Sequence, residues 1–453
     1  MNQNVNLVEG SIVKGLSKLA FPIMGTSLIQ MAYNLTDMIW IGRVSSNAVA
    51  AVGAAGMYLW LANGIAAVPR TGGQVKAAHA LGAEDQEQAA AYGKAAIHMG
   101  LVMIVLCTAI YLIFNKGLIG FFRLNHESVV RDARAYLVIV GAGLVFSFMN
   151  QIFTGLFTAM GNSIVTFRST VVGLVANIVL DPVFIFGAGP VPVLGVAGAA
   201  IATVLAQAIV FLMFLAAIRK DRSLFGRIRL TTGSKKEDWV EIGKIGIPVA
   251  AQNIIFSSLS MIIARIIAGW GDAAVAVQKV GSQIESISWM TADGFATAVN
   301  AFIAQNHGAR KKERIRKGYR TAMGLMALWG VITTFVLIVF PEVIFRIFIT
   351  EKAILPMGVS YLRILGVSQL FMCMEITTSG AFQGLGKPMA PAVVGIVGNA
   401  SRIPMALLLS ATALGLNGVW WSISISSILK GIVVPVWFLF VLRDFMKKDV
   451  RTI

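Results

Sequence analysis

Long apolar runs dominate the chain, and they constrain its fold more than any other feature. Hydrophobic residues make up 57% of the 453 residues and charged residues 13%, against roughly 25% charged in a typical soluble domain. A helix needs about 20 mostly apolar residues to cross a bilayer. We therefore predict an all-α polytopic membrane protein with twelve transmembrane helices, at residues 16–42, 48–75, 95–122, 134–160, 164–187, 194–218, 242–269, 274–304, 320–348, 357–384, 389–413 and 417–442.

The second half of the chain repeats the first. Pro22, near the start of the first apolar run, is matched by Pro248 at the start of the seventh (248 − 22 = 226). The segment Val171–Asn177 returns as Val393–Asn399 (393 − 171 = 222). Two repeats of six helices each follow from this duplication.

Basic residues gather in a few of the loops. They crowd into Arg219–Lys244 and His307–Arg320, and a last group near the C-terminus comprises Arg443, Lys447, Lys448 and Arg451. Cytoplasmic loops carry such an excess of Lys and Arg, so we expect both termini and the central linker to be cytoplasmic. The two halves then have the same orientation, as parallel repeats related by an axis along the membrane normal. The predicted organisation is a first bundle at 1–218, a basic linker at 219–241 and a second bundle at 242–453.

Several classes of function are excluded by the sequence. The formal charge of +17 lies in separate loops and does not form the single basic face of a nucleic-acid-binding protein. Cys107 and Cys373 stand far apart in apolar runs, which offers neither a disulfide framework nor metal-ligand spacing. No phosphate-binding loop and no nucleophile motif occur, and the N-terminal run lacks a cleavage site, so we interpret it as a retained span. We expect a transporter without a cofactor, driven by an ion gradient or by the substrate itself, rather than an enzyme.

Two aspartates lie inside the apolar runs of the first half. In the register of the repeat, Asp37 falls opposite Ile262 or Ile263, and Asp181 falls opposite Ile403. An ionisable residue within a span is a functional hypothesis by default, because burying its charge is costly. Both aspartates lie roughly 8–9 Å inward from the outer ends of their spans. The asymmetry points to ion coupling in the first half.

Polar neighbours accompany these acids. Asn177 precedes Asp181 by one helical turn, and Thr203 lies about 12 Å inward from the same side. Two carboxyl groups in apolar surroundings are suited to bind and release a proton. The oxygens of Asp37, Asn177, Asp181 and Thr203 could instead hold a small hard cation. The alternative for each residue is structural, as a satisfied buried acid or a polar link between helices.

Further residues of the first half are candidates for substrate binding. Tyr33 and Asn34 share a helix face with Asp37, and Met31 and Asn150 complete the predicted substrate contacts. Helix association is the alternative for the polar residues, and for Met31 core filling is the favoured interpretation. Pro22 shares a span with Asp37 and is a candidate hinge, because proline removes a backbone donor and permits a bend.

The second half contains other charges within its spans. Glu375 is a candidate second coupling group or cation contact, but a satisfied structural acid is the favoured interpretation. Glu285 and Asp293 are candidates to pair with Lys279, and Arg265 or Arg402 is a candidate to neutralise other acids.

These residues carry a family resemblance. The chain resembles the multidrug and toxic compound extrusion (MATE) family, most closely its DNA-damage-inducible protein F (DinF)-like branch. The resemblance rests on the proline that opens each half, on Asn34-Leu35-Thr36-Asp37-Met38, on the Gly-Ala pair after spans two and eight, and on Asn177-x3-Asp181-Pro182. It implies a V-shaped pair of bundles and export of lipophilic cations by antiport with H⁺ or Na⁺. It also implies a coupling site at Asp37, Asn177, Asp181 and Thr203, with Pro22 allowing the first helix to bend.

One departure from the family pattern bears on the ion. Sodium-driven members carry a glutamate in span seven and an aspartate in span ten, whereas here span seven has no acid and Glu375 is the only candidate in span ten. The departure favours H⁺, with Na⁺ at the same first-half residues as the alternative. A lipid-linked precursor flippase is a further alternative. We expect a monomer in the cytoplasmic (inner) membrane, with the lipid bilayer and small lipophilic cations as its partners.

Overall fold

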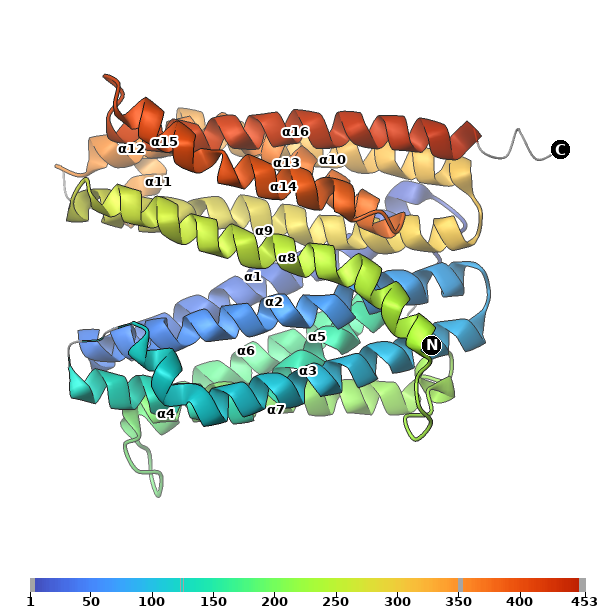
Figure 1. Ribbon diagram of the computed structural model, residues 1–453, viewed down its shortest axis with the longest axis horizontal. Coiled ribbons are helices and arrows are strands. Elements are labelled where there is room, and N and C mark those ends of the chain that lie inside the picture. Colours follow the sequence, from blue (N-terminus) through green and yellow to red (C-terminus); the bar gives the residue numbers. More distant parts are fainter. Residues whose placement is uncertain (1–4, 123, 125, 349–352, 448–453) are drawn as a thin grey trace. The chain divides into compact units, whose positions relative to one another are not determined.

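The protein is a bundle of helices, with no β-strand in the part of the chain that the structure describes. This computed structural model describes residues 5–122, 124, 126–348 and 353–447, so Lys448 and Arg451 of the predicted C-terminal basic group lie outside it. The helices, shown in Figure 1, are α1 Ile12–Val44, α2 Ser46–Gly82, α3 Gln86–Gly120, α4 Glu127–Ala142, α5 Leu144–Ala159, α6 Ser163–Phe186, α7 Gly195–Lys220, α8 Lys236–Ala268, α9 Asp272–Gly308, α10 Lys312–Val339, α11 Pro341–Arg346, α12 Leu355–Gly366, α13 Gln369–Gly384, α14 Met389–Ala400, α15 Arg402–Ser410 and α16 Leu416–Lys447, with a short 3₁₀ turn, η1, at Phe225–Arg227.

These helices account for all twelve predicted spans. Among the described residues, nine helical segments are long and apolar enough to cross a membrane, and two further spans are bent pairs, α4 with α5 (50°) and α12 with α13 (47°). The remaining predicted span is α9, whose 37 residues extend about 55 Å but carry more polar side chains than the others. The bend between α4 and α5 lies at Gly143, where a Cβ atom would overlap the side chain of Val204 on α7.

Two compact units divide the chain, and each takes one helix end from the other half of the sequence. The first unit contains residues 1–5 and 25–250, and the second contains residues 6–24 and 251–453. The start of α1 therefore belongs with the second unit and the start of α8 with the first, whereas the predicted boundaries keep each helix in its own half. In each helix the last residue before the change of unit lies two residues beyond a proline. This residue is Met24, beyond Pro22, in α1 (24 − 22 = 2), and Ala250, beyond Pro248, in α8 (250 − 248 = 2).

Glycines bring the start of α8 against α2 in the first unit. A Cβ atom at Gly246 would collide with the backbone of Val68, and one at Gly72 would collide with the backbone of Ile242. Lipid supplies no hydrophobic force between helices, so small residues that permit close backbone approach hold such pairs together. The same pair is joined at its polar end, where Lys76 Nζ lies 2.5 Å from Glu241 Oε2.

In the second unit, α13 is the central helix and packs against α9, α10 and α16. Its neighbours bury large aromatic side chains. Trp420 and Tyr361 are fully buried and meet edge to face with ring centroids 5.2 Å apart. The indole N–H of Trp420 donates to Gln278 Oε1 at 3.0 Å, so this polar group is satisfied inside the unit.

Outward-facing side chains are strongly apolar in both units. Val105 and Ile113 of α3 are 66% and 70% exposed, and Phe440 of α16 is 60% exposed. A soluble protein rarely exposes apolar side chains over long continuous helices. Lipid is the solvent that accommodates them, so the chain is a multi-pass membrane protein.

The close contact at Gly246 gives a test of this packing. We expect Gly246→Ala to lower the stability of the protein by about 1–3 kcal/mol, because overpacking a tight contact forces backbone shifts. Thermal unfolding of the detergent-solubilised protein measures the change. Gly56→Ala in α2 is the control, because no heavy atom lies within 4 Å of a Cβ atom there. Equal melting temperatures for the two variants would contradict the assigned contact.

Candidate functional site

Polar side chains from four helices gather inside the first unit. Tyr33 and Asp37 come from α1, Tyr136 from α4, Asn177 and Asp181 from α6, and Thr203 from α7. We call these six residues the acidic cluster. Because the cluster is built from four helices, it brings together residues as far apart in the sequence as Tyr33 and Thr203 (203 − 33 = 170).

Asp181 and Asn177 form the centre of the acidic cluster. Both are fully buried, and Asn177 Nδ2 donates to Asp181 Oδ1 at 3.1 Å. Their spacing of four residues places them on one face of α6, as predicted from the sequence. The amide therefore holds one oxygen of the carboxyl group in place.

Asp37 lies beside both of these residues, so two carboxyl groups face each other in an apolar unit. Buried oxygen atoms of this group have no hydrogen-bond partner: Asp37 Oδ1, Asp181 Oδ2 and Asn177 Oδ1. Two ionised carboxylates at such close range repel each other. A proton shared between them, or a cation held by the free oxygens, would relieve the repulsion.

Hydroxyl groups form the other side of the acidic cluster. Tyr33 and Tyr136 both lie beside Thr203, and the side-chain oxygens of Tyr33 and Thr203 are buried without a hydrogen-bond partner. Tyr136 was not predicted from the sequence, because the expected span began at residue 134 and placed this tyrosine at the membrane edge. In the structure α4 starts at Glu127, so Tyr136 lies about 14 Å along the helix.

The remaining predicted substrate contacts lie in different environments. Asn34 is exposed and Met31 is half-buried. Asn150 is buried and its Nδ2 donates to the backbone oxygen and to Oε1 of Gln207, both at 2.9 Å, which links α5 to α7. The structure thus brings Tyr33 together with the coupling residues, while Asn150 forms a link between helices. The substrate roles of Tyr33, Asn34, Met31 and Asn150 stay predictions.

Glu375 in the second unit has a cationic partner. Its carboxylate lies 3.1 Å from Lys430 Nζ, and each side chain is 8% exposed. Lys430 was not predicted, although a single lysine in the middle of the last apolar span is the signal that such a partner exists. The structure supports the structural reading of Glu375 by showing it paired, and a coupling role for it stays a prediction.

Two further charged residues of the second unit, Glu285 and Arg402, form hydrogen bonds with polar side chains. Glu285 accepts hydrogen bonds from Gln369 Nε2 at 2.7 Å and Tyr361 Oη at 3.1 Å, in place of the predicted ion pair with Lys279. Arg402 donates to the hydroxyl oxygens of Ser426 and Ser427 at 2.6 and 3.1 Å. Every one of these charges has a partner, unlike the free oxygens of the acidic cluster.

Comparison with known proteins places the chain in a family. The MatE family model matches residues 22–183 and again residues 248–408, so it recognises both repeats. The chain belongs to the MatE family. The two matches begin at Pro22 and Pro248, the prolines that open the two halves.

Similar proteins extend over nearly the whole length of this MatE chain. It is 28% identical over 436 residues to a probable multidrug resistance protein NorM of Thermotoga maritima, covering 94% of this chain and 92% of the relative. It is 22% identical to the multidrug export protein MepA of Staphylococcus saprophyticus, covering 97% and 96% of the two chains. A crystal structure of MATE in the bent conformation matches with a TM-score of 0.91 and 25% identity over 99% of both chains. MATE structures of this kind have twelve transmembrane helices in two bundles, which confirms the predicted fold class; assignment to the DinF-like branch stays a prediction.

The buried ion pair of Glu375 and Lys430 gives a test of the structural role of these two residues in the second unit. We expect Lys430→Met to destabilise the protein by about 3–5 kcal/mol, because it leaves a buried carboxylate without a partner. Replacing both partners, as Lys430→Met with Glu375→Leu, should restore most of the loss. Thermal unfolding in detergent measures both variants. A single variant as stable as the parent protein would contradict the pairing.

Proposed function

We propose that the protein exports lipophilic cationic compounds by antiport with H⁺, using the acidic cluster as the coupling site. The observation that carries this proposal is the pair of facing carboxyl groups, Asp37 and Asp181, with unpartnered buried oxygens on both. The relatives named as multidrug resistance and multidrug export proteins support the substrate class. Export from the cytoplasm by a protein in the inner membrane, with both termini cytoplasmic, follows the predicted topology.

Competition for the carboxyl groups would couple the two fluxes. A cationic substrate bound near Asp37 is attracted by the ionised form of the acids. A proton arriving from outside neutralises the pair and removes this attraction, so the substrate leaves. Because the acids cannot hold both at once, each exported cation requires an incoming proton. This scheme needs no cofactor and a single copy of the chain.

Pro22 is the proposed hinge in this cycle. It lies in α1, which carries Tyr33 and Asp37 further along, and the chain passes from the second unit to the first two residues later. A proline inside a helix removes one backbone hydrogen bond and lowers the resistance to bending. Solved relatives in a bent and in a straight conformation support a change of conformation within the family.

Coupling to Na⁺ is the second candidate, and the free oxygens favour it. Asp37 Oδ1, Asp181 Oδ2, Asn177 Oδ1 and Thr203 Oγ1 are all buried and have no hydrogen-bond partner in the described part of the chain. Carboxylate, amide and hydroxyl oxygens are ligands for hard cations. We favour H⁺ because two carboxyl groups in direct contact can share a proton without further ligands. A flippase for anionic lipid-linked precursors is disfavoured, since the carboxyl groups of Asp37 and Asp181 would repel an anionic headgroup at the acidic cluster.

The aspartate on α1 gives the decisive variant. We expect Asp37→Asn to reduce proton-driven efflux to the level of empty liposomes, because an amide cannot bind and release a proton, while the protein still inserts and folds. Efflux of a fluorescent cationic dye from proteoliposomes under an imposed pH gradient is the measurement. Asp132→Asn on α4 is the matched control, because this carboxylate is 41% exposed and lies outside the acidic cluster. Normal export by Asp37→Asn would overturn the proposal.

The same liposomes separate the two ions. With H⁺ coupling, a pH gradient drives dye efflux in sodium-free buffer, and a Na⁺ gradient at equal pH does not. If the Na⁺ gradient drives dye efflux and the pH gradient does not, sodium is the coupling ion at Asp37, Asn177, Asp181 and Thr203. Transport driven by neither gradient would contradict ion antiport altogether.

A further inference from the structure

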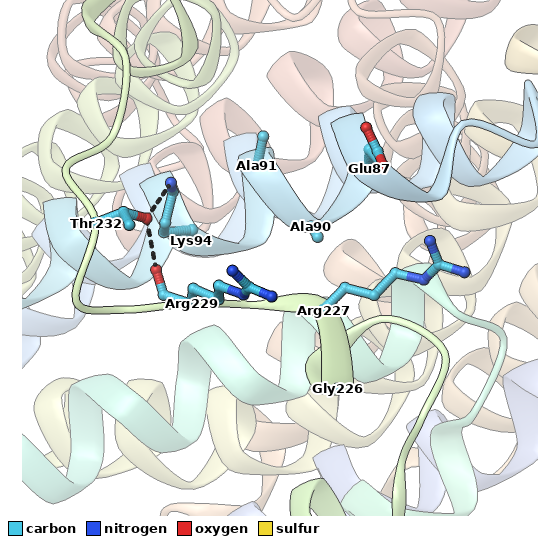
Figure 2. Close-up of a pocket in the computed structure, with 8 residues that line it drawn as sticks. All are labelled: Glu87, Ala90, Ala91, Lys94, Gly226, Arg227, Arg229 and Thr232. Atoms are coloured by element: carbon cyan, nitrogen blue, oxygen red, sulfur yellow. Dashed lines mark hydrogen bonds between the residues drawn. The ribbon is translucent and has the colours of Figure 1, made fainter.

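A pocket of about 530 Å³ lies in the first unit, between α3 and the linker that follows α7 (Figure 2). Glu87 and Lys94 line it from α3, and Arg227, Arg229 and Thr232 line it from the linker. Glu87 and Lys94 stand at opposite ends of the pocket, about two helical turns apart on α3 (Figure 2). We call this cavity the linker pocket. It is separate from the acidic cluster, with which it shares no residue.

The beginning of the linker is folded into a fixed turn. The carboxylate of Asp221 accepts hydrogen bonds from the backbone N–H groups of Leu224 and Phe225 at 3.0 and 2.9 Å, and from the hydroxyl group of Ser223 at 2.7 Å. Phe225 is buried, and its ring centroid lies 4.9 Å from that of Phe157 on α5. This end of the linker is therefore anchored in the core of the unit.

The end of the linker is anchored on α3. His98 interacts with the hydroxyl group of Ser234 at 2.6 Å and with the backbone oxygen of Leu230 at 3.1 Å. Lys94 Nζ donates to Thr232 Oγ1 and to the backbone oxygen of Gly233, both at 3.1 Å. With both ends attached, the segment that carries Arg227 and Arg229 is positioned before any ligand binds.

Ile228 anchors the part of the linker that carries the two arginines. Its side chain packs against Gly93 of α3, where a Cβ atom would lie 2.9 Å from Ile228 Cδ1. Arg227 ends the 3₁₀ turn η1, and Arg229 follows Ile228. Both arginines are exposed and line the pocket (Figure 2).

The charges of the linker pocket are unbalanced. Lys94, Arg227 and Arg229 oppose a single acid, Glu87. Among the described residues neither arginine side chain has an ion pair or hydrogen bond, and Lys94 uses two of its three donors. A guanidinium group binds phosphate oxygens with two parallel N–H donors. Two such groups on the anchored linker, with the ammonium of Lys94 on α3, form a basic site that suits a phosphate group.

We propose that the linker pocket binds a phosphate-bearing anion. Its position supports a phospholipid headgroup as one source, because basic pockets between transmembrane helices on the cytoplasmic side bind anionic headgroups, and the basic linker is predicted to be cytoplasmic. Free phosphate groups in the cytoplasm are the other source. Glu87 at the far end of the pocket offers an acceptor for a hydroxyl group next to the phosphate. This inference does not depend on the proposed antiport.

Binding to the purified full-length protein in detergent tests the proposal. The probes are dioctanoyl phosphatidylglycerol, inorganic phosphate, and dioctanoylglycerol, which has the acyl chains without the phosphate. We expect Arg227→Gln with Arg229→Gln to weaken binding of the phosphate-bearing probe about 30-fold, since each basic side chain near an anionic surface contributes roughly a fivefold gain. Lys235→Gln with Lys236→Gln is the matched control, because it removes the same charge from the same linker outside the pocket.

Three outcomes decide the proposal and its source. If Arg227→Gln with Arg229→Gln weakens the binding of phosphatidylglycerol alone, the result supports a lipid headgroup as the ligand. If the same variant also weakens the binding of inorganic phosphate, the result supports a soluble ligand. Equal losses in both double variants, or equal binding of dioctanoylglycerol, would overturn the site. Glu87→Gln tests whether the change in affinity has the expected direction. The substitution removes a negative charge that repels phosphate, so it should tighten phosphate binding several-fold. Damage to the fold would weaken binding instead. Because no ion gradient is applied, these results are independent of the outcome for antiport.

Discussion

Lipid gives this protein no hydrogen-bond partners and no hydrophobic force between helices, and the rest of the structure depends on that constraint. Backbone groups are satisfied within helices, and helices associate where small residues let them approach closely. Gly246 against Val68 in the first unit, and Gly380 against Ala296 in the second, are contacts of this kind. Side chains that would form a core in water, such as Ile113, are instead directed outward.

The same constraint makes each buried charge informative. In the second unit Glu375 is neutralised by Lys430, and Glu285 is held by Gln369 and Tyr361. In the first unit Asp181 accepts a hydrogen bond from the amide of Asn177, and among the described residues neither its second oxygen nor one oxygen of Asp37 has a partner. Charges with fixed partners stabilise one arrangement of helices. Carboxyl groups without fixed partners are available to bind an ion or a substrate.

The spans and the central residues of the site could be predicted because they depend on local patterns. Apolar length identified the helices, and the spacing of four residues placed Asn177 with Asp181. Tyr136 and Lys430 were missed because their importance arises from neighbours on other helices, which no local pattern records. The pairing of Glu285 was wrong for the same reason: Lys279 is close in sequence, yet Gln369, on another helix, is the residue in reach.

The exchange of helix ends between the units bears on the origin of the duplication. Residues 6–24 complete the unit formed by the second repeat, and the start of α8 completes the unit formed by the first. A single repeat alone would lack the helix end that its unit now takes from the other repeat. Two copies supply these ends to each other, as in a domain-swapped dimer. Fusion of the two genes would then have made a mutual dependence permanent, so that neither half is complete without the other.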